Sequence, residues 1–183
     1  MTNSFAAAAG SRAQASHTVS VAFEDAYQLH AARVHRFCIA LVGDSDAAQD
    51  LTHETFVRAF AASSRTPPDA ATIGTWLLSI ARNLCTDYHR RQGRWRRLLS
   101  GIGAAPVPQG DVEQLAERTS ELKRVTAALD HMNARDRELI GLRVAADLSY
   151  REMAQVLGST ESIVKVATFR ALTKLRSRLE ESP

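Results

Sequence analysis

The sequence predicts an all-α protein made of two small helical domains joined by a flexible linker. Three observations support this fold class. Apolar residues recur at steps of three and four in several segments, which is the spacing of one buried helix face. No segment alternates apolar and polar residues as a half-buried strand does. Only 9 glycines and 5 prolines occur in 183 residues, which is few for a turn-rich β protein.

These patterns divide the chain into four segments. Residues 1–18 lack periodicity and are expected to form a flexible tail. Three amphipathic helices follow within residues 19–92, and they can bury one another's apolar faces as one domain. Glycine and proline cluster in residues 93–112, which we interpret as the linker. Helical spacing resumes in a second domain at residues 113–183.

The first domain is predicted to contain three helices. The first runs from Phe23 to Gly43, and the polar residues 44–46 can cap the second. A loop must follow at residues 63–71, because proline is excluded from helix interiors. The buried face of the second helix is expected to comprise Ala47, Ala48, Leu51, Thr55, Phe56, Ala59 and Phe60. The third helix has the clearest apolar stripe, formed by Ile73, Trp76, Leu77, Ile80, Ala81, Leu84 and Tyr88.

The second domain contains the pattern of a helix-turn-helix. Ser149 and Glu152 are three residues apart, as in a capping box that satisfies the free amides at a helix start. Gly158 follows a short helix and permits the left-handed backbone of a tight turn. The small Ala154 allows the two helices to approach, and Val164 fills the gap between them. Such a pair places its second helix in a position to enter a major groove.

The helix after this turn is basic. Residues 160–178 hold five Lys or Arg side chains against one glutamate, and such a surface can neutralise phosphates and read guanine edges. Charge runs usually form only a solvated face, so DNA binding is favoured by the combination with the turn pattern. The predicted buried face consists of Ile163, Val164, Ala167, Ala171, Leu172 and Leu175. Another helix, earlier in this domain, carries the apolar residues Leu139, Ile140, Leu142 and Val144.

Successive helices of the first domain carry opposite charges. Residues 44–54 hold four acidic side chains and no Lys or Arg, and we interpret them as a protein-binding surface or a solvated face. Residues 82–97 hold six arginines against Asp87, which suits binding to phosphates and unstacked bases. Asn83 lies opposite the apolar stripe, where its amide could hydrogen-bond a base edge. Trp76 lies on the stripe and is more simply a core residue.

No catalytic or metal-binding motif is recognisable. The four acids lack the ligand spacing and glycine of a calcium loop, and Val57 stands where the zinc-protease pattern that begins at His53 needs a second histidine. We therefore expect neither an enzyme nor a cofactor or metal. Cys38 and Cys85 are interpreted as buried thiols rather than a redox switch. With no apolar run near the ~20 residues of a membrane span and no signal peptide, we expect a cytoplasmic protein.

Together these motifs resemble the extracytoplasmic-function (ECF) branch of the sigma-70 family, over roughly residues 23–179. The stretch from Ala48 to Phe56 resembles the acidic signature of sigma region 2. The stretch from Trp76 to Arg91 resembles the promoter-melting helix of the same region. The stretch from Leu148 to Ala171 resembles sigma region 4. The first domain is thus region 2-like and the second region 4-like.

The resemblance implies an alternative sigma factor that binds core RNA polymerase, at its clamp coiled coil and flap, and directs promoter recognition and melting in transcription initiation. An anti-sigma factor is implied as a further partner. The implied polymerase-binding residues are Asp50, His53 and Glu54. The implied −10 DNA-binding residues are Arg82, Asn83, Arg90 and Arg91. The implied −35 DNA-binding residues are Lys165, Val166, Phe169, Arg170 and Lys174.

Two other functions fit parts of the sequence. A helix-turn-helix regulator that does not join RNA polymerase would use the second domain, but the acidic helix with Asp50 and Glu54 would have no role. A sigma-like interaction protein that sequesters a partner without binding DNA would leave both basic segments unexplained. The sigma-factor hypothesis accounts for all three charged surfaces and is therefore favoured.

Overall fold

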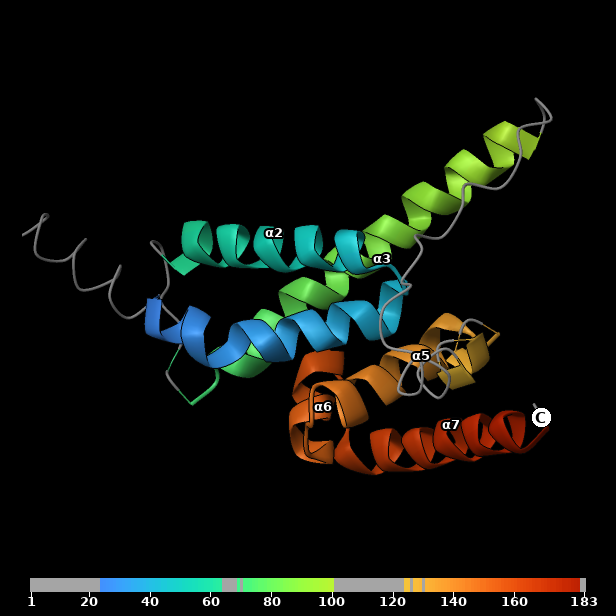
Figure 1. The fold of residues 1–183 in the computed structure, drawn as a ribbon. Helices are drawn as coiled ribbons and strands as arrows, with labels where there is room; N and C mark the ends of the chain where they lie inside the picture. Colours follow the sequence, from blue (N-terminus) through green and yellow to red (C-terminus); the bar gives the residue numbers. More distant parts are fainter. Residues whose placement is uncertain are drawn as a thin grey trace, which may run out of the picture.

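The computed structural model describes residues 24–63, 69, 71–100, 124–125, 127–129 and 131–181, and in these ranges it contains helices and turns but no strand. The expected tail and the expected linker beyond residue 100 lie outside the described residues. The longer helical elements are a first helix at residues 24–42, α2 (Ser45–Ser63), α3 (Ile73–Ser100), α5 (Ala134–Ile140), the π-helical turn η1 (Gly141–Ala145), α6 (Tyr150–Leu157) and α7 (Glu161–Glu181) (Figure 1). The predicted all-α fold class is confirmed.

Three helices form the first half of the molecule, as predicted. The backbone amide of Ala47 donates to Asp44 Oδ1 at 2.7 Å, so α2 has the expected acidic cap. The first helix and α2 meet through an edge-to-face contact of Tyr27 and Phe56, whose ring centroids are 4.7 Å apart. The fully buried residues of this half include Phe37, Cys38, Leu77, Leu78 and Cys85.

The buried face of α2 differs from the prediction. Phe60, which we expected in the core, is 45% exposed, whereas Thr52 is buried. Thr52 Oγ1 donates to the carbonyl oxygen of Ala48 at 2.7 Å, so burial leaves this hydroxyl paired. The apolar pattern alone could not predict a buried threonine whose hydroxyl is hydrogen-bonded within its own helix.

Helix α3 is longer than the apolar stripe suggested. It continues to Ser100, although Gly93 had indicated the start of the linker. A single glycine in a helix interior costs only about 1 kcal/mol relative to alanine, which neighbouring helical residues can offset. Trp76 packs against the core cluster, in agreement with its interpretation as a core residue.

The second half contains a π-helical segment that the sequence did not predict. After α5, the amide of Ala146 donates to the carbonyl of Gly141 at 2.9 Å, which is the wider hydrogen-bond spacing of a π turn. Val144, one of the apolar residues predicted on this helix, lies within the π turn and is 63% exposed. Ile163 is also exposed, because its neighbour Val164 occupies the inward face of α7.

The helix-turn-helix is formed as predicted. Ser149 Oγ accepts from the amide of Glu152, and the amide of Ser149 donates to Glu152 Oε2 at 2.8 Å, so both halves of the capping box are present. Ser149 Oγ also donates to Glu152 Oε2 at 2.6 Å, and this bond, together with the one from the Ser149 amide, favours the charged carboxylate and lowers the pKa of Glu152. Gly158 adopts φ 58° and ψ 42°, and both Ala154 and Val164 are buried between α6 and α7.

The two halves pack directly against each other. Gly141 of η1 faces the first helix so closely that a Cβ there would lie 2.8 Å from Leu41 Cδ1 and 3.3 Å from Phe37 Cδ2. Arg36 Nε donates to the carbonyl oxygen of Ala145 at 3.1 Å, and α3 contacts α6 (Figure 1). Buried residues of both halves therefore belong to one continuous core.

The capping box makes a measurable contribution to stability. We expect Ser149→Ala to lower the free energy of unfolding by about 1 kcal/mol, since the amide of Glu152 loses its acceptor and the Glu152 carboxylate loses the Ser149 hydroxyl as a donor. In a chain of this size the melting temperature falls by about 2–4 °C. Because the native pKa of Glu152 is lowered, the difference between the two proteins should shrink as pH falls below 4.5, the ordinary value for this group. Thermal denaturation followed by circular dichroism at several pH values measures both effects.

Candidate functional site

One face of α7 carries most of the residues predicted to read duplex DNA. Lys165, Val166, Phe169 and Arg170 are all exposed, at positions that fall on the same side of the helix. Val166 is 52% exposed and Phe169 is 70% exposed, so apolar surface lies between the two cations. Phosphates attract the cations, and base edges in a major groove offer apolar thymine methyl groups as well as polar atoms. This face therefore has the chemistry of a recognition helix.

Lys174 differs from the other predicted residues of α7. Its Nζ lies 2.7 Å from Asp136 Oδ2 of α5, whose side chain is only 12% exposed. This ion pair connects α7 to α5, which lies before η1 and α6 in the chain. The side chain of Lys174 is 57% exposed, so it pairs with an acid of α5 while it remains accessible beside Arg170.

The basic helix α3 presents three of its four predicted DNA-binding residues to solvent. Asn83, Arg90 and Arg91 are exposed and share one side of the helix, at steps of seven and eight from Asn83. Arg90 Nη1 lies 3.6 Å from Asp87 Oδ1 on the same surface, a distance typical of a weak exposed pair. The face combines an amide that can read a base edge with cations that can bind phosphates.

The fourth predicted residue, Arg82, forms an ion pair with an acid of the second half. Its Nε donates to Glu138 Oε1 of α5, 56 residues away in the sequence. The side chain of Glu138 is only 10% exposed, and its other oxygen accepts from Arg135 Nη1 at 2.6 Å. A carboxylate this far from solvent requires such partners, because burial without them is costly. The structure thus separates Arg82 from the other predicted DNA-binding residues of α3.

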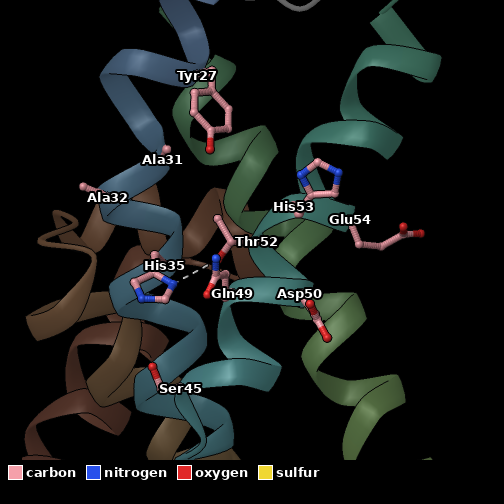
Figure 2. A pocket seen from close by; sticks show the side chains of 10 residues that line it. All are labelled: Tyr27, Ala31, Ala32, His35, Ser45, Gln49, Asp50, Thr52, His53 and Glu54. Carbon is pink, nitrogen blue, oxygen red and sulfur yellow. Dashed lines mark hydrogen bonds between the residues drawn. The ribbon is translucent and has the colours of Figure 1, made fainter.

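Asp50 and Glu54 of α2 line a cleft of about 570 Å³ between α2 and the first helix (Figure 2). Its lining residues are Tyr27, Ala31, Ala32, His35, Ser45, Gln49, Asp50, Thr52, His53 and Glu54. All three residues predicted to bind polymerase are therefore brought together. Glu54 Oε1 also accepts from Arg58 Nε at 2.7 Å in a half-exposed pair, which a charged partner could replace at low cost.

Sequence reasoning missed the opposite wall of this cleft. Tyr27, Ala31 and His35 come from the first helix, and Thr52 Oγ1 lies 3.5 Å from His35 Nδ1 across it. Tyr27, Ala31 and His35 follow one another at steps of four, so they form one face of the first helix. That spacing was present in the sequence, but only the packing of the two helices shows that this face meets the acidic one.

The two cysteines lie in the core, away from these surfaces. Cys38 and Cys85 are free and buried, as predicted. The hydrogen bond between them lowers the pKa of the Cys38 thiol, and the same bond together with burial raises that of Cys85. Across the described part of the chain, no cluster of three or more His, Cys, Asp or Glu side chains could hold a metal ion. No helix in that part is long and apolar enough to cross a membrane.

Comparison with known proteins identifies both halves. Residues 26–95 match the family model described as Sigma-70 region 2, and residues 122–175 match Sigma-70, region 4. The chain is 31% identical over 163 residues to the ECF RNA polymerase sigma factor BldN of Streptomyces coelicolor, a match that covers 87% of this chain and 61% of BldN. It is 30% identical over 165 residues to the ECF RNA polymerase sigma factor SigX of Bacillus subtilis, covering 86% of this chain and 84% of SigX.

Solved structures share the fold. The sigma factor RpoE in its complex with the anti-sigma factor NepR from Bartonella quintana has a TM-score of 0.63 at 24% identity, covering 88% of this chain and 98% of RpoE. CnrH, solved with the cytosolic domain of CnrY, also has a TM-score of 0.63, at 23% identity and with coverage of 93% and 96%. Since region 2 and region 4 occur in order on one chain, a stand-alone helix-turn-helix regulator is not favoured. The chain belongs to the ECF RNA polymerase sigma factors of the sigma-70 family.

Proposed function

We propose that this chain is a transcription initiation factor rather than an enzyme, and that each of its three charged surfaces carries out one function of a sigma factor. The cleft at Asp50 binds core RNA polymerase, the exposed face of α3 acts on the −10 element, and the exposed face of α7 reads the −35 element. The observation that carries this proposal is the presence of an acidic docking cleft and two basic faces on a single chain that matches both sigma regions. The proposed activity requires a cytoplasmic location.

Recognition of the −35 element rests on a complete helix-turn-helix. The capping box and the left-handed Gly158 fix α7 relative to α6, and the buried Val164 keeps the opposite face of α7 turned outward. Lys165 and Arg170 supply cations for phosphates or guanine edges, while Val166 and Phe169 supply apolar contacts. The combination suits a duplex rather than a flat protein surface.

Action on the −10 element rests on Asn83, Arg90 and Arg91. Extracting a base from a duplex costs a few kcal/mol, so the protein must offer contacts that compensate. An amide can hydrogen-bond the edge of an extruded base, and the two arginines can hold the neighbouring phosphates. All three side chains are accessible on one side of α3.

Docking to polymerase rests on the cleft formed by α2 and the first helix. Asp50 and His53 are exposed on its rim, and Glu54 is half-exposed. Such a surface attracts a basic partner and sets its orientation more than its affinity. The proposed partners are the clamp coiled coil for this cleft and the flap for the second half of the chain.

We also propose an anti-sigma factor as a partner. The structures of RpoE and CnrH were solved with NepR and with the cytosolic domain of CnrY, respectively. The shared fold makes a partner of the same kind reasonable for this chain. Its binding would compete with the surfaces described above.

Run-off transcription tests the proposed function as a whole. Core RNA polymerase is incubated with a library of genomic promoter fragments, with and without the chain. We expect transcripts that require the chain and that share two upstream sequence elements. A transcript pattern unaffected by the chain, together with no binding to core polymerase, would contradict the proposal.

Recognition of the −35 element depends on Arg170. We expect Arg170→Ala to weaken binding to a duplex carrying a promoter from that library by about tenfold, because one charge-assisted contact is lost. Fluorescence anisotropy at a fixed salt concentration measures this affinity. Arg176→Ala is the matched control, since this substitution removes the same charge from α7. Arg176 lies beyond the C-terminal end of the proposed face and pairs with Glu180. Equal losses in both variants would mean that α7 contributes only general charge.

Polymerase docking depends on Asp50. We expect Asp50→Asn to weaken binding to core RNA polymerase by about fivefold or more with unchanged helicity, since the substitution removes one charge and little volume. Asp25→Asn is the matched control, because Asp25 is an exposed acid of the first helix outside the cleft. Biolayer interferometry with immobilised core enzyme gives both affinities. Full retention of binding by Asp50→Asn would assign docking to another surface.

A further inference from the structure

Two apolar side chains occupy the middle of the exposed face of α7. Val166 is 52% exposed and Phe169 is 70% exposed. Each residue turns an α-helix by about 100°, so the order around this face is Lys165, Phe169, Val166 and Arg170. The apolar pair therefore lies between two cations, and a molecule that binds this face must contact both kinds of side chain.

Internal packing does not explain the outward position of this apolar pair. The opposite side of α7 buries Val164 and Ala171 completely. Thr168 is also fully buried there, and its Oγ1 has no hydrogen-bond partner within the described part of the chain. A polar side chain thus lies inside the helix packing while Val166 and Phe169 face solvent, which reverses the usual distribution. We therefore interpret the apolar pair as a binding surface rather than a part of the core.

The base edges of a major groove offer one apolar group to such a pair. Guanine, adenine and cytosine present hydrogen-bonding atoms there, whereas thymine also presents its C5 methyl group. Helix α7 contains neither asparagine nor glutamine, the side chains that pair bidentately with adenine. This helix therefore lacks the usual means of recognising an A·T pair through its adenine, but it has apolar side chains suited to the thymine.

We propose that Val166 and Phe169 select the −35 element by contact with the C5 methyl groups of thymines, between guanine or phosphate contacts made by Lys165 and Arg170. The N-terminal turns of a recognition helix are the part that reaches base edges, and Val166 lies in the second turn of α7. This inference rests on the proposed role of α7 in reading duplex DNA and adds the chemical group that is read. The −35 element is accordingly expected to contain at least one A·T pair beside a G·C pair.

Deoxyuridine substitution tests the contact with the methyl group. The full chain is bound to core RNA polymerase, and each thymine of the −35 element in a promoter duplex from the run-off library is replaced in turn by deoxyuridine. This change removes the C5 methyl group and keeps the base pair and its hydrogen-bonding atoms. We expect affinity at matched salt to fall about fourfold at one or two positions, the effect of burying roughly one methyl group. Deoxyuridine in the spacer between the two elements should have no effect.

Variants at the two apolar positions assign the contact to its side chains. We expect Val166→Ala and Phe169→Ala to weaken binding to the thymine duplex, and each to abolish the effect of deoxyuridine at one position. Both residues are exposed, so alanine leaves no cavity in the core. Val144→Ala is the matched control, since it shortens a 63% exposed valine of η1 outside α7. The control should retain the fourfold discrimination, and circular dichroism checks the helicity of each protein.

Four results would overturn the proposal. Reading of the methyl group is wrong if the parent binds every deoxyuridine duplex as tightly as the thymine duplex, or if the −35 element contains only G·C pairs. The assignment to the apolar pair is wrong if both alanine variants keep the discrimination. A protein partner would be indicated for this face if the variants lost affinity for core polymerase but not for the duplex.

Arg170→Ala separates these failures from a failure of the proposed function. If this variant weakens duplex binding while deoxyuridine has no effect, α7 still reads the −35 element and only the contact with the methyl group is wrong. If neither change alters duplex binding, the proposed role of α7 is wrong, and the inference fails with it.

Discussion

The approach of η1 to the first helix at Gly141 determines how the two halves of this molecule meet. Because Gly141 has no side chain, the backbone of the π turn lies against Phe37 and Leu41, and apolar residues from both halves merge into one core. Arg36 adds a hydrogen bond to the carbonyl of Ala145 at the end of the same turn. Beside this contact, α3 and α5 are joined by the ion pair of Arg82 and Glu138.

Helix α5 acts as an electrostatic connection between the two halves. Asp136 and Glu138 are two residues apart, so their side chains point to nearly opposite sides of the helix. Asp136 pairs with Lys174 of α7, and Glu138 pairs with Arg82 of α3. Both acids are largely buried, and each also has a partner on or beside α5: Asn133 for Asp136 and Arg135 for Glu138. One short helix thus joins α7 to the first half of the chain.

The surfaces assigned to the partners share a simple construction. Each belongs to a helix whose opposite face is buried, so the exposed face carries polar or charged residues without loss of core packing. In α7 the inward Val164 and Ala171 leave Arg170 outward, and in α3 the inward Cys85 leaves Asn83 outward.

The sequence by itself determined the fold class, the capping box, the turn at Gly158 and the exposed positions of Asp50, Asn83 and Arg170. These features depend on local spacing and backbone conformation, which neighbouring residues specify directly. Only the tertiary structure decided the environments of Arg82 and Lys174, because each pairs with an acid far away in the sequence. It likewise decided the exposure of Val144, which lies in the π turn, and the second wall of the acidic cleft. A long-range ion pair or a change from α-helical to π-helical hydrogen bonding produces no periodic pattern in the sequence. The apolar spacing within a single helix therefore could not have predicted these features.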